Sequence, residues 1–330
     1  MSNAPAPADP AAPVKIALLF SGQGAQAVGM GESLAAASPA AAALIDRANA
    51  TLERPLSRLM FAGPLEELTL TGNCQPALFV HGLAALAALR ERLGGRELPV
   101  AGAAGLSLGE WTAHAAAGTF DFPTALRLVE KRGQFMEEAC AQTAGAMAAL
   151  IGAEEKLADE LAAECEVDVA NVNAPGQIVL SGEATKIALA VERAKERGLR
   201  RVAMLNVAGA YHSRLMDPAY LKLGEELVHT ILRAPQFPVI ANVTAQPAPT
   251  DDFDELRRTL VEQVTSTVRW SASVEYLIDE LGCNLFLELG PGEVLAGLAR
   301  RIRKGTEVLS VGDAPSLDRA VERLLPVVGL

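Results

Sequence analysis

The chain has 330 residues, half of them hydrophobic, and a formal net charge of −11 at pH 7. This length can bury a large core in one or two domains, and the negative charge argues against a nucleic-acid partner because phosphates would be repelled. Four cysteines lie far apart without C-x-x-C spacing, so we expect no disulfide framework and no metal site, and a reducing, cytoplasmic location.

The first 14 residues, MSNAPAPADPAAPV, are rich in Ala and Pro. They lack the basic and apolar regions of a signal peptide, so we expect a disordered leader over residues 1–14. No run approaches the roughly 20 uninterrupted apolar residues of a membrane span. A membrane partner is therefore not expected.

Short apolar runs alternate with helical patterns along most of the chain. The run KIALLF (15–20) predicts a buried strand, 31–52 a continuous helix, and 75–95 a helix that ends in glycine. The segment 122–140 predicts a helix with Pro123 in its first turn, where the missing N–H costs little. Strands that alternate with helices favour a mainly parallel sheet covered by helices.

The section from 143 to 207 has a different rhythm, in which strand and helix patterns follow each other as β-α-β-β-α-β. This is the order of a ferredoxin-like unit. We therefore predict a small ferredoxin-like domain at 143–207, inserted into a large α/β domain that comprises residues 15–142 and 208–330.

The segment AAGLSLGEWTA (103–113) places Ser107 between Gly105 and Gly109, after an apolar strand and before a helix. A strand, G-x-S-x-G and a helix make a nucleophile elbow, whose serine has strained backbone angles. Its hydroxyl stands at the positive end of a helix, where an oxyanion is stabilised. The alternative is a plain glycine-rich turn, because these five residues occur by chance in many chains.

A serine nucleophile needs a base, and the chain has four histidines. His81 and His229 lie in helical runs, and His114 lies two turns beyond Ser107, so structural roles are expected for these three. His212, in the irregular stretch NVAGAYHSRLMDP after the insert, is the candidate base. No acidic residue lies in a clear strand-end loop between Ser107 and His212. A Ser–His dyad oriented by a main-chain carbonyl is the simpler hypothesis.

A second glycine-rich turn, FSGQGAQAVGMG (20–31), fits G-x-G-x-x-A after a strand. A dinucleotide site would require a second strand that ends in an acidic residue about 20 positions on. The chain instead stays helical there, and Asp46 lies within that helix. A turn that donates main-chain N–H groups to an anionic oxygen is the preferred interpretation.

Several segments between about Lys15 and Arg303 resemble, in order and spacing, the malonyl-CoA:acyl carrier protein transacylases. They include LLFSGQGAQAVGMG, AGLSLGEWTAHAAAG, NVNAPGQIVLSG, VAGAYHSRLMDPA and FLELGPGEVLAGLARRI. The resemblance implies an α/β-hydrolase-like large domain with a ferredoxin-like insert. It also implies malonyl transfer from malonyl-CoA to the phosphopantetheine thiol of acyl carrier protein, in fatty acid synthesis, with no cofactor.

Carried over residue by residue, the resemblance makes Ser107 the acylated serine, His212 the general base and Arg132 the partner of the malonyl carboxylate. It assigns an oxyanion hole to the main-chain N–H groups of Gln23 and Leu108. It further implies that a main-chain carbonyl orients the histidine, and this carbonyl belongs to Gln263.

Arg132 can also be interpreted without the family. Its neighbours on the helix are apolar, which is typical of an arginine at the edge of a core and equally of a guanidinium held for a substrate carboxylate. Four residues depart from the commonest family pattern and leave acyl selectivity open: Ser21, Leu106, Trp111 and Tyr211.

Three alternatives accompany this hypothesis: a trans-acting acyltransferase of a polyketide synthase, a serine hydrolase, and a noncatalytic module that binds carrier protein. Arg132 argues against a hydrolase, because simple esters carry no free carboxylate. We expect a monomer that docks its carrier protein on a local basic surface. The candidate clusters are 89–96, 193–201 and 300–305, of which 193–201 is preferred and 300–305 is second.

Overall fold

The computed structural model describes residues 13–329, so the predicted leader, residues 1–14, lies almost wholly outside the described residues. The strands of the larger sheet, sheet A, are β1 (Ile16–Phe20), β2 (Val100–Gly105), β7 (Val239–Ile240), β8 (Leu285–Leu289) and β9 (Val308–Val311). The strands of the smaller sheet, sheet B, are β3 (Gly145–Ile151), β4 (Asp168–Ala174), β5 (Gln177–Glu183) and β6 (Arg201–Met204).

Helices precede, separate and follow these strands. Before sheet B the chain forms α1 (Glu32–Ala37), α2 (Pro39–Leu52), α3 (Leu56–Ala62), α4 (Leu65–Thr69), α5 (Thr71–Arg92), α6 (Leu108–Ala116) and α7 (Phe122–Gln142). Within sheet B it forms α8 (Glu155–Cys165) and α9 (Ala184–Glu196). After sheet B come the 3-10 turn η1 (Arg214–Met216), α10 (Asp217–Val228), α11 (Phe253–Glu262), α12 (Trp270–Asp279), α13 (Val294–Ile302) and α14 (Ala314–Leu324).

The two sheets differ in strand direction. Sheet A has the order β7-β2-β1-β8-β9 with every neighbouring pair parallel. Sheet B has the order β4-β5-β3-β6 with every pair antiparallel, which is the ferredoxin-like arrangement. The predicted fold class is confirmed, and the exact domain boundaries at 143 and 207 stay a prediction.

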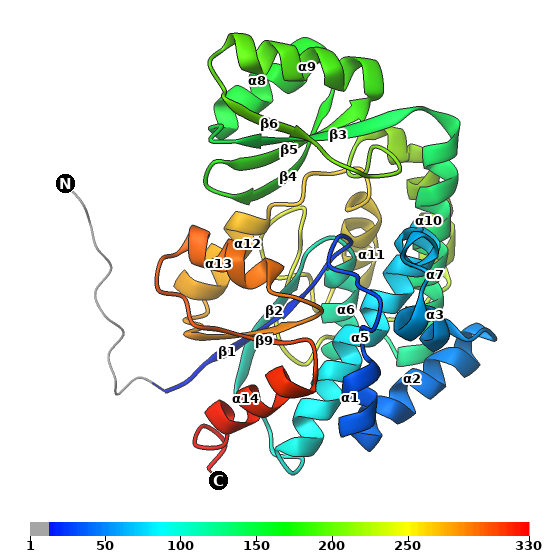
Figure 1. Ribbon diagram of the computed structural model, residues 1–330, viewed down its shortest axis with the longest axis vertical. Helices are drawn as coiled ribbons and strands as arrows, with labels where there is room; N and C mark the ends of the chain where they lie inside the picture. Colours follow the sequence, from blue (N-terminus) through cyan, green and yellow to red (C-terminus); the bar gives the residue numbers. More distant parts are fainter. Residues whose placement is uncertain (1–12, 330) are drawn as a thin grey trace.

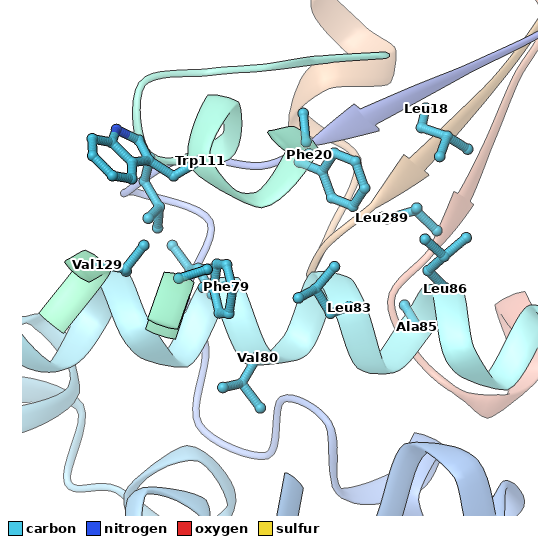
Figure 2. Packing of buried hydrophobic residues seen from close by; sticks show 14 of the residues in the cluster. Leu18, Phe20, Phe79, Val80, Leu83, Ala85, Leu86, Trp111, Val129 and Leu289 are labelled. Carbon is cyan, nitrogen blue, oxygen red and sulfur yellow. The ribbon is translucent and has the colours of Figure 1, made fainter. Parts of the chain in front are cut away.

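Helices cover both faces of sheet A (Figure 1). Along β1, Leu18 and Phe20 belong to the core under α5, whereas Ala17 and Leu19 belong to the core under α12 and α13. Side chains of α5 such as Phe79 and Leu83 point toward the ends of β1 and β8 (Figure 2). Because both faces are buried, β1 is apolar at every position.

The two helices of the insert, α8 and α9, cover just one face of sheet B. α8 and α9 lie on the face turned away from sheet A (Figure 1), where they pack on Leu150, Ile178 and Leu180. The opposite face contributes Met147 and Val179 to the core shared with the rest of the chain. That face of sheet B is the one that meets the candidate site.

The prediction of one continuous helix over residues 31–52 is wrong. The segment 31–52 is not a continuous helix, since α1 ends at Ala37 and α2 begins at Pro39. Ser38 between them is extended and its side chain accepts a hydrogen bond from Ala41 N, as an N-cap does. Proline at the next position cannot continue a helix but suits the first turn of a new one.

The helix predicted at 75–95 begins earlier, at Thr71, and ends at Arg92. The helix with Pro123 in its first turn is confirmed as α7. Between residues 13 and 329, no helix is both long enough and apolar enough to cross a membrane.

Candidate active site

Ser107 occupies the turn between β2 and α6, and its backbone is strained as predicted. Its φ of 52° and ψ of −108° lie outside the regions that ordinary residues favour, at a cost on the order of 1–3 kcal/mol. The two flanking glycines are required by distance. A Cβ on Gly105 would lie 1.8 Å from the Gly109 carbonyl carbon, and one on Gly109 would lie 2.1 Å from the Phe20 oxygen.

His212 lies against Ser107. Its Nε2 is 2.7 Å from Ser107 Oγ, and its Nδ1 is 2.8 Å from the Gln263 main-chain oxygen. Because a carbonyl can only accept, Nδ1 carries the proton and Nε2 is left free to accept one from the serine. Burial and the nearby Arg132 charge lower the pKa of His212 to about 4. The imidazole is therefore neutral at pH 7, as a general base must be.

Arg132, on α7, is 1% exposed and lies on the other side of Ser107. Its Nη2 donates to Ser107 Oγ at 3.1 Å and to Gln263 Oε1 at 3.0 Å, and its Nη1 donates to Gln75 Oε1 at 2.6 Å. Burial lowers its pKa to about 10, so the guanidinium is still charged at neutral pH. A buried cation beside Ser107 Oγ is suited to bind an anionic group.

Gln263 joins these groups to one another. Its side-chain oxygen also accepts from Trp111 Nε1 at 3.2 Å. Its Nε2 donates to the Ser107 main-chain oxygen at 2.8 Å, to Glu110 Oε2 at 2.6 Å and to Asn242 Oδ1 at 3.2 Å. Donors thus surround one end of the amide and acceptors the other, so its orientation is fixed.

The two residues predicted to form the oxyanion hole lie at the cavity that Ser107 lines. Gln23, in the loop after β1, and Leu108, the first residue of α6, both line the cavity beside Ser107. Neither main-chain N–H donates a hydrogen bond to another residue of the described chain. Both are therefore free to donate to a substrate oxygen, and their role as an oxyanion hole stays a prediction.

Comparison with known proteins places this geometry in a family. The protein-family model described as the acyl transferase domain matches residues 17–324 of this chain. The chain belongs to the acyl transferase domain family. Its resemblance to the malonyl-CoA:acyl carrier protein transacylases is confirmed by a relative from Bacillus subtilis with that name, which is 42% identical over 315 residues, 94% of this chain and 97% of the relative.

Solved structures agree with the acyl transferase fold. The acyl-carrier-protein-S-malonyltransferase of Bartonella henselae is similar with a TM-score of 0.89 and 39% identity, over 96% of this chain and 100% of that one. A malonyl-transacylase in complex with a type II PKS acyl carrier protein is similar with a TM-score of 0.88 and 37% identity, over 94% and 99% of the two chains.

The cavity of the acyl transferase domain lies between the two sheets and measures about 490 Å³. Ser107 and His212 line it from the large domain, while Met147, Asn173 and Val179 line it from sheet B. Tyr211 also lines it, and its hydroxyl lies 2.7 Å from Thr71 Oγ1. The cavity is thus polar around Ser107 and His212 and apolar where Met147 and Val179 line it.

Within the described residues, none of the other three histidines makes a hydrogen bond to Ser107 Oγ. His81 is fully buried in α5, and burial lowers its pKa to about 4. His114 is buried in α6, where its Nδ1 lies 3.0 Å from Thr119 Oγ1. His229 caps the C-terminus of α10. Within residues 13–329, no group of three or more His, Cys, Asp or Glu side chains is placed to hold a metal ion.

Three buried polar residues of the site were not predicted: Gln75, Glu110 and Asn242. Glu110 is fully buried, and this burial raises the pKa of its carboxyl to about 7. A sequence signal for Glu110 existed, because it is the one acidic residue in an otherwise apolar first turn of α6. Gln75 and Asn242 carry no comparable local signal.

The basic clusters are partly neutralised. In the cluster at 193–201, Arg193 pairs with Glu164 and Glu196, and Arg197 pairs with Glu160 and Glu164. The helix α9, which carries Arg193 and is capped by Arg197, packs on the face of sheet B opposite the cavity. In the cluster at 300–305, Arg303 pairs with Asp279. The docking face stays a prediction.

Proposed function

We propose that the protein transfers the malonyl group from malonyl-CoA to the phosphopantetheine thiol of an acyl carrier protein, through a malonyl ester of Ser107. One observation supports this above all: a single oxygen, Ser107 Oγ, lies 2.7 Å from a neutral imidazole and 3.1 Å from a buried guanidinium. The imidazole activates the oxygen, and the guanidinium selects an acyl group that carries a carboxylate.

In the first half of the reaction, His212 Nε2 takes the Ser107 hydroxyl proton while Oγ attacks the malonyl thioester carbon. The N–H groups of Gln23 and Leu108 stabilise the negative oxygen that forms. When the carbon–sulfur bond breaks, His212 returns the proton to the departing CoA sulfur. The Gln263 carbonyl holds the imidazole in the required tautomer throughout.

In the second half, the phosphopantetheine thiol replaces CoA. His212 takes the thiol proton, the sulfur attacks the ester carbon, and the proton then passes to Ser107 Oγ as the ester bond breaks. Arg132 is beneath the cavity surface, so the malonyl carboxylate pairs with it by taking the place of Ser107 Oγ on Nη2. The reaction uses no cofactor.

The product serves fatty acid synthesis. Supply of a polyketide carrier protein is the second candidate, because the solved malonyl-transacylase complex holds a type II PKS acyl carrier protein. We place the enzyme in the cytoplasm, where reducing conditions suit its four free cysteines.

The covalent intermediate provides the test. Malonyl-CoA alone should add one malonyl mass to the wild-type protein, and holo acyl carrier protein should then remove it and gain the same mass. Ser107→Ala should show no adduct, because the accepting oxygen is gone. An adduct that survives in Ser107→Ala, or release of free malonate in place of transfer, would contradict the proposal.

A further inference from the structure

The main-chain N–H of Ser107 has an acceptor from a distant segment. Ser107 is the N-cap of α6, so its own N–H has no partner inside the helix. It donates to Asn242 Oδ1 at 2.9 Å, across 135 residues of sequence. Asn242 follows the short strand β7, which pairs with β2, and its side chain is fully buried.

The same amide binds the other side of the turn. Asn242 Nδ2 donates to the Gly105 carbonyl at 2.8 Å. One side chain therefore bridges the last residue of β2 and the nucleophile, with only Leu106 between them. These two bonds tie down a turn whose strained angles persist only where the surroundings hold them.

Asn242 is itself held in one orientation. Its main-chain N–H donates to Glu110 Oε2 at 3.0 Å, and its Oδ1 also accepts from Gln263 Nε2 at 3.2 Å. The carbonyl of Gly105 requires the NH₂ end of the amide, and the two N–H donors require the oxygen end. A flip of the amide would break all three side-chain bonds.

We propose that Asn242 is a positioning residue for the nucleophile. Its amide fixes the backbone of Ser107 so that Oγ meets His212 Nε2 and the thioester carbon in line. Within the described residues Asn242 makes no hydrogen bond to Oγ, to the imidazole or to Arg132, so it acts on Oγ through the turn, and its one other side-chain partner is Gln263. This inference rests on the proposed function only in taking Ser107 as the nucleophile.

The test is the reactivity of Ser107 in Asn242→Ala. A misplacement of about 1 Å costs on the order of 10²-fold in rate, and we expect that loss in Ser107 acylation by malonyl-CoA and acetyl-CoA alike. The ratio of the two rates should not change, because Arg132 keeps its partners. The same loss should occur with phenylmethylsulfonyl fluoride, a small serine reagent that loses fluoride and needs no acyl recognition.

The matched control is Asn49→Ala. Asn49 also holds a turn with both ends of its amide, bonding Ser57 N and Oγ at the start of α3, and it does not line the cavity. Melting temperatures of both variants are measured, and all rates are taken well below them. Asn49→Ala should react at the wild-type rate however much its melting temperature falls.

The two hypotheses fail separately. The positioning role would be overturned if Asn242→Ala were sulfonylated as fast as the wild-type protein. It would also be overturned if Asn49→Ala lost as much reactivity of Ser107 as Asn242→Ala does. A wild-type protein that reacts with the sulfonyl fluoride but accepts no malonyl group would overturn the proposed function alone. Where Asn242→Ala does not fold, Asn242→Ser takes its place, with the same losses expected because one short hydroxyl cannot bridge both groups.

Discussion

Sheet A and sheet B both border the cavity, but they do so with different parts of their strands. The strand ends of sheet A lie at the cavity, where Gln23 follows β1 and Ser107 follows β2, and Asn242, which follows β7, is buried behind Ser107. Sheet B brings a face, with Met147 from β3 and Val179 from β5.

The difference lies in what the backbone offers at each place. At the ends of parallel strands the sheet's hydrogen bonding stops, so free main-chain groups and buried polar side chains can be fixed there. In the middle of an antiparallel sheet every main-chain group is paired, and only side chains reach the cavity. Sheet A thus sets the chemistry, and sheet B sets the shape of the space in front of it.

The largest expected effect lies on the side of sheet A. Arg132→Ala should lower malonyl transfer far more than acetyl transfer, because acetyl-CoA carries no carboxylate to leave unpaired. The change in preference should be about 2–5 kcal/mol, roughly 30- to 5,000-fold, measured as the ratio of kcat/KM values. Arg127→Ala, an exposed arginine on the same helix, is the control. If kcat/KM fell equally for both thioesters, Arg132 would have a structural role and would not bind the malonyl carboxylate.

A smaller effect concerns the pH dependence of the base. Burial first, and the Arg132 charge second, lower the pKa of His212 from 6.5 to about 4. The rate of Ser107 acylation at about pH 5.5 should therefore stay close to its value at pH 7.5, where an unperturbed imidazole would lose about tenfold. Rapid-quench mass spectrometry across the pH range measures this, and an acid limb near 6.5 would contradict it.

The same shift affects stability with a definite sign. The unfolded chain binds a proton to this imidazole at a higher pH than the folded protein does. The contribution of His212 is thus fully present above pH 6.5 and is lost as pH falls from 6.5 toward 4.

The smallest expected change in kinetics comes from a residue next to sheet B. Asn206, in the segment after β6, lines the cavity, and its exposed side chain makes no hydrogen bond within the described chain. Asn206→Ala should raise KM for malonyl-CoA by roughly 2- to 10-fold, the equivalent of one hydrogen bond. Sulfonylation of Ser107 should be unchanged. A loss of sulfonylation would show that the segment after sheet B takes part in the chemistry.

Much of the fold could be predicted because its signals are local. Apolar runs, helical periodicity and the glycines around Ser107 indicated the strands of sheet B, the elbow and the α/β class. The break at Ser38 was missed although Pro39 marked it. The signal was present there, but the apolar pattern on both sides outweighed it.

The buried polar network could not be predicted from local patterns. Asn242 lies 135 residues from Ser107, and Gln75 lies 57 residues from Arg132. They meet only because β7 pairs with β2 and because α5 and α7 lie side by side. A strand of two residues such as β7 has no detectable periodicity, so the position of Asn242 follows from tertiary structure alone.

The double attachment of Gln263 has a consequence for protein engineering. Its main chain contacts the imidazole and its side chain contacts the guanidinium. An exchange of Arg132 for a neutral residue, made to widen the range of acyl donors, removes one of the two donors that anchor the Gln263 oxygen. Substrate scope and turnover are therefore linked in this scaffold. A variant with a broader range of acyl donors will need another hydrogen-bond donor near Gln263 before its turnover can recover.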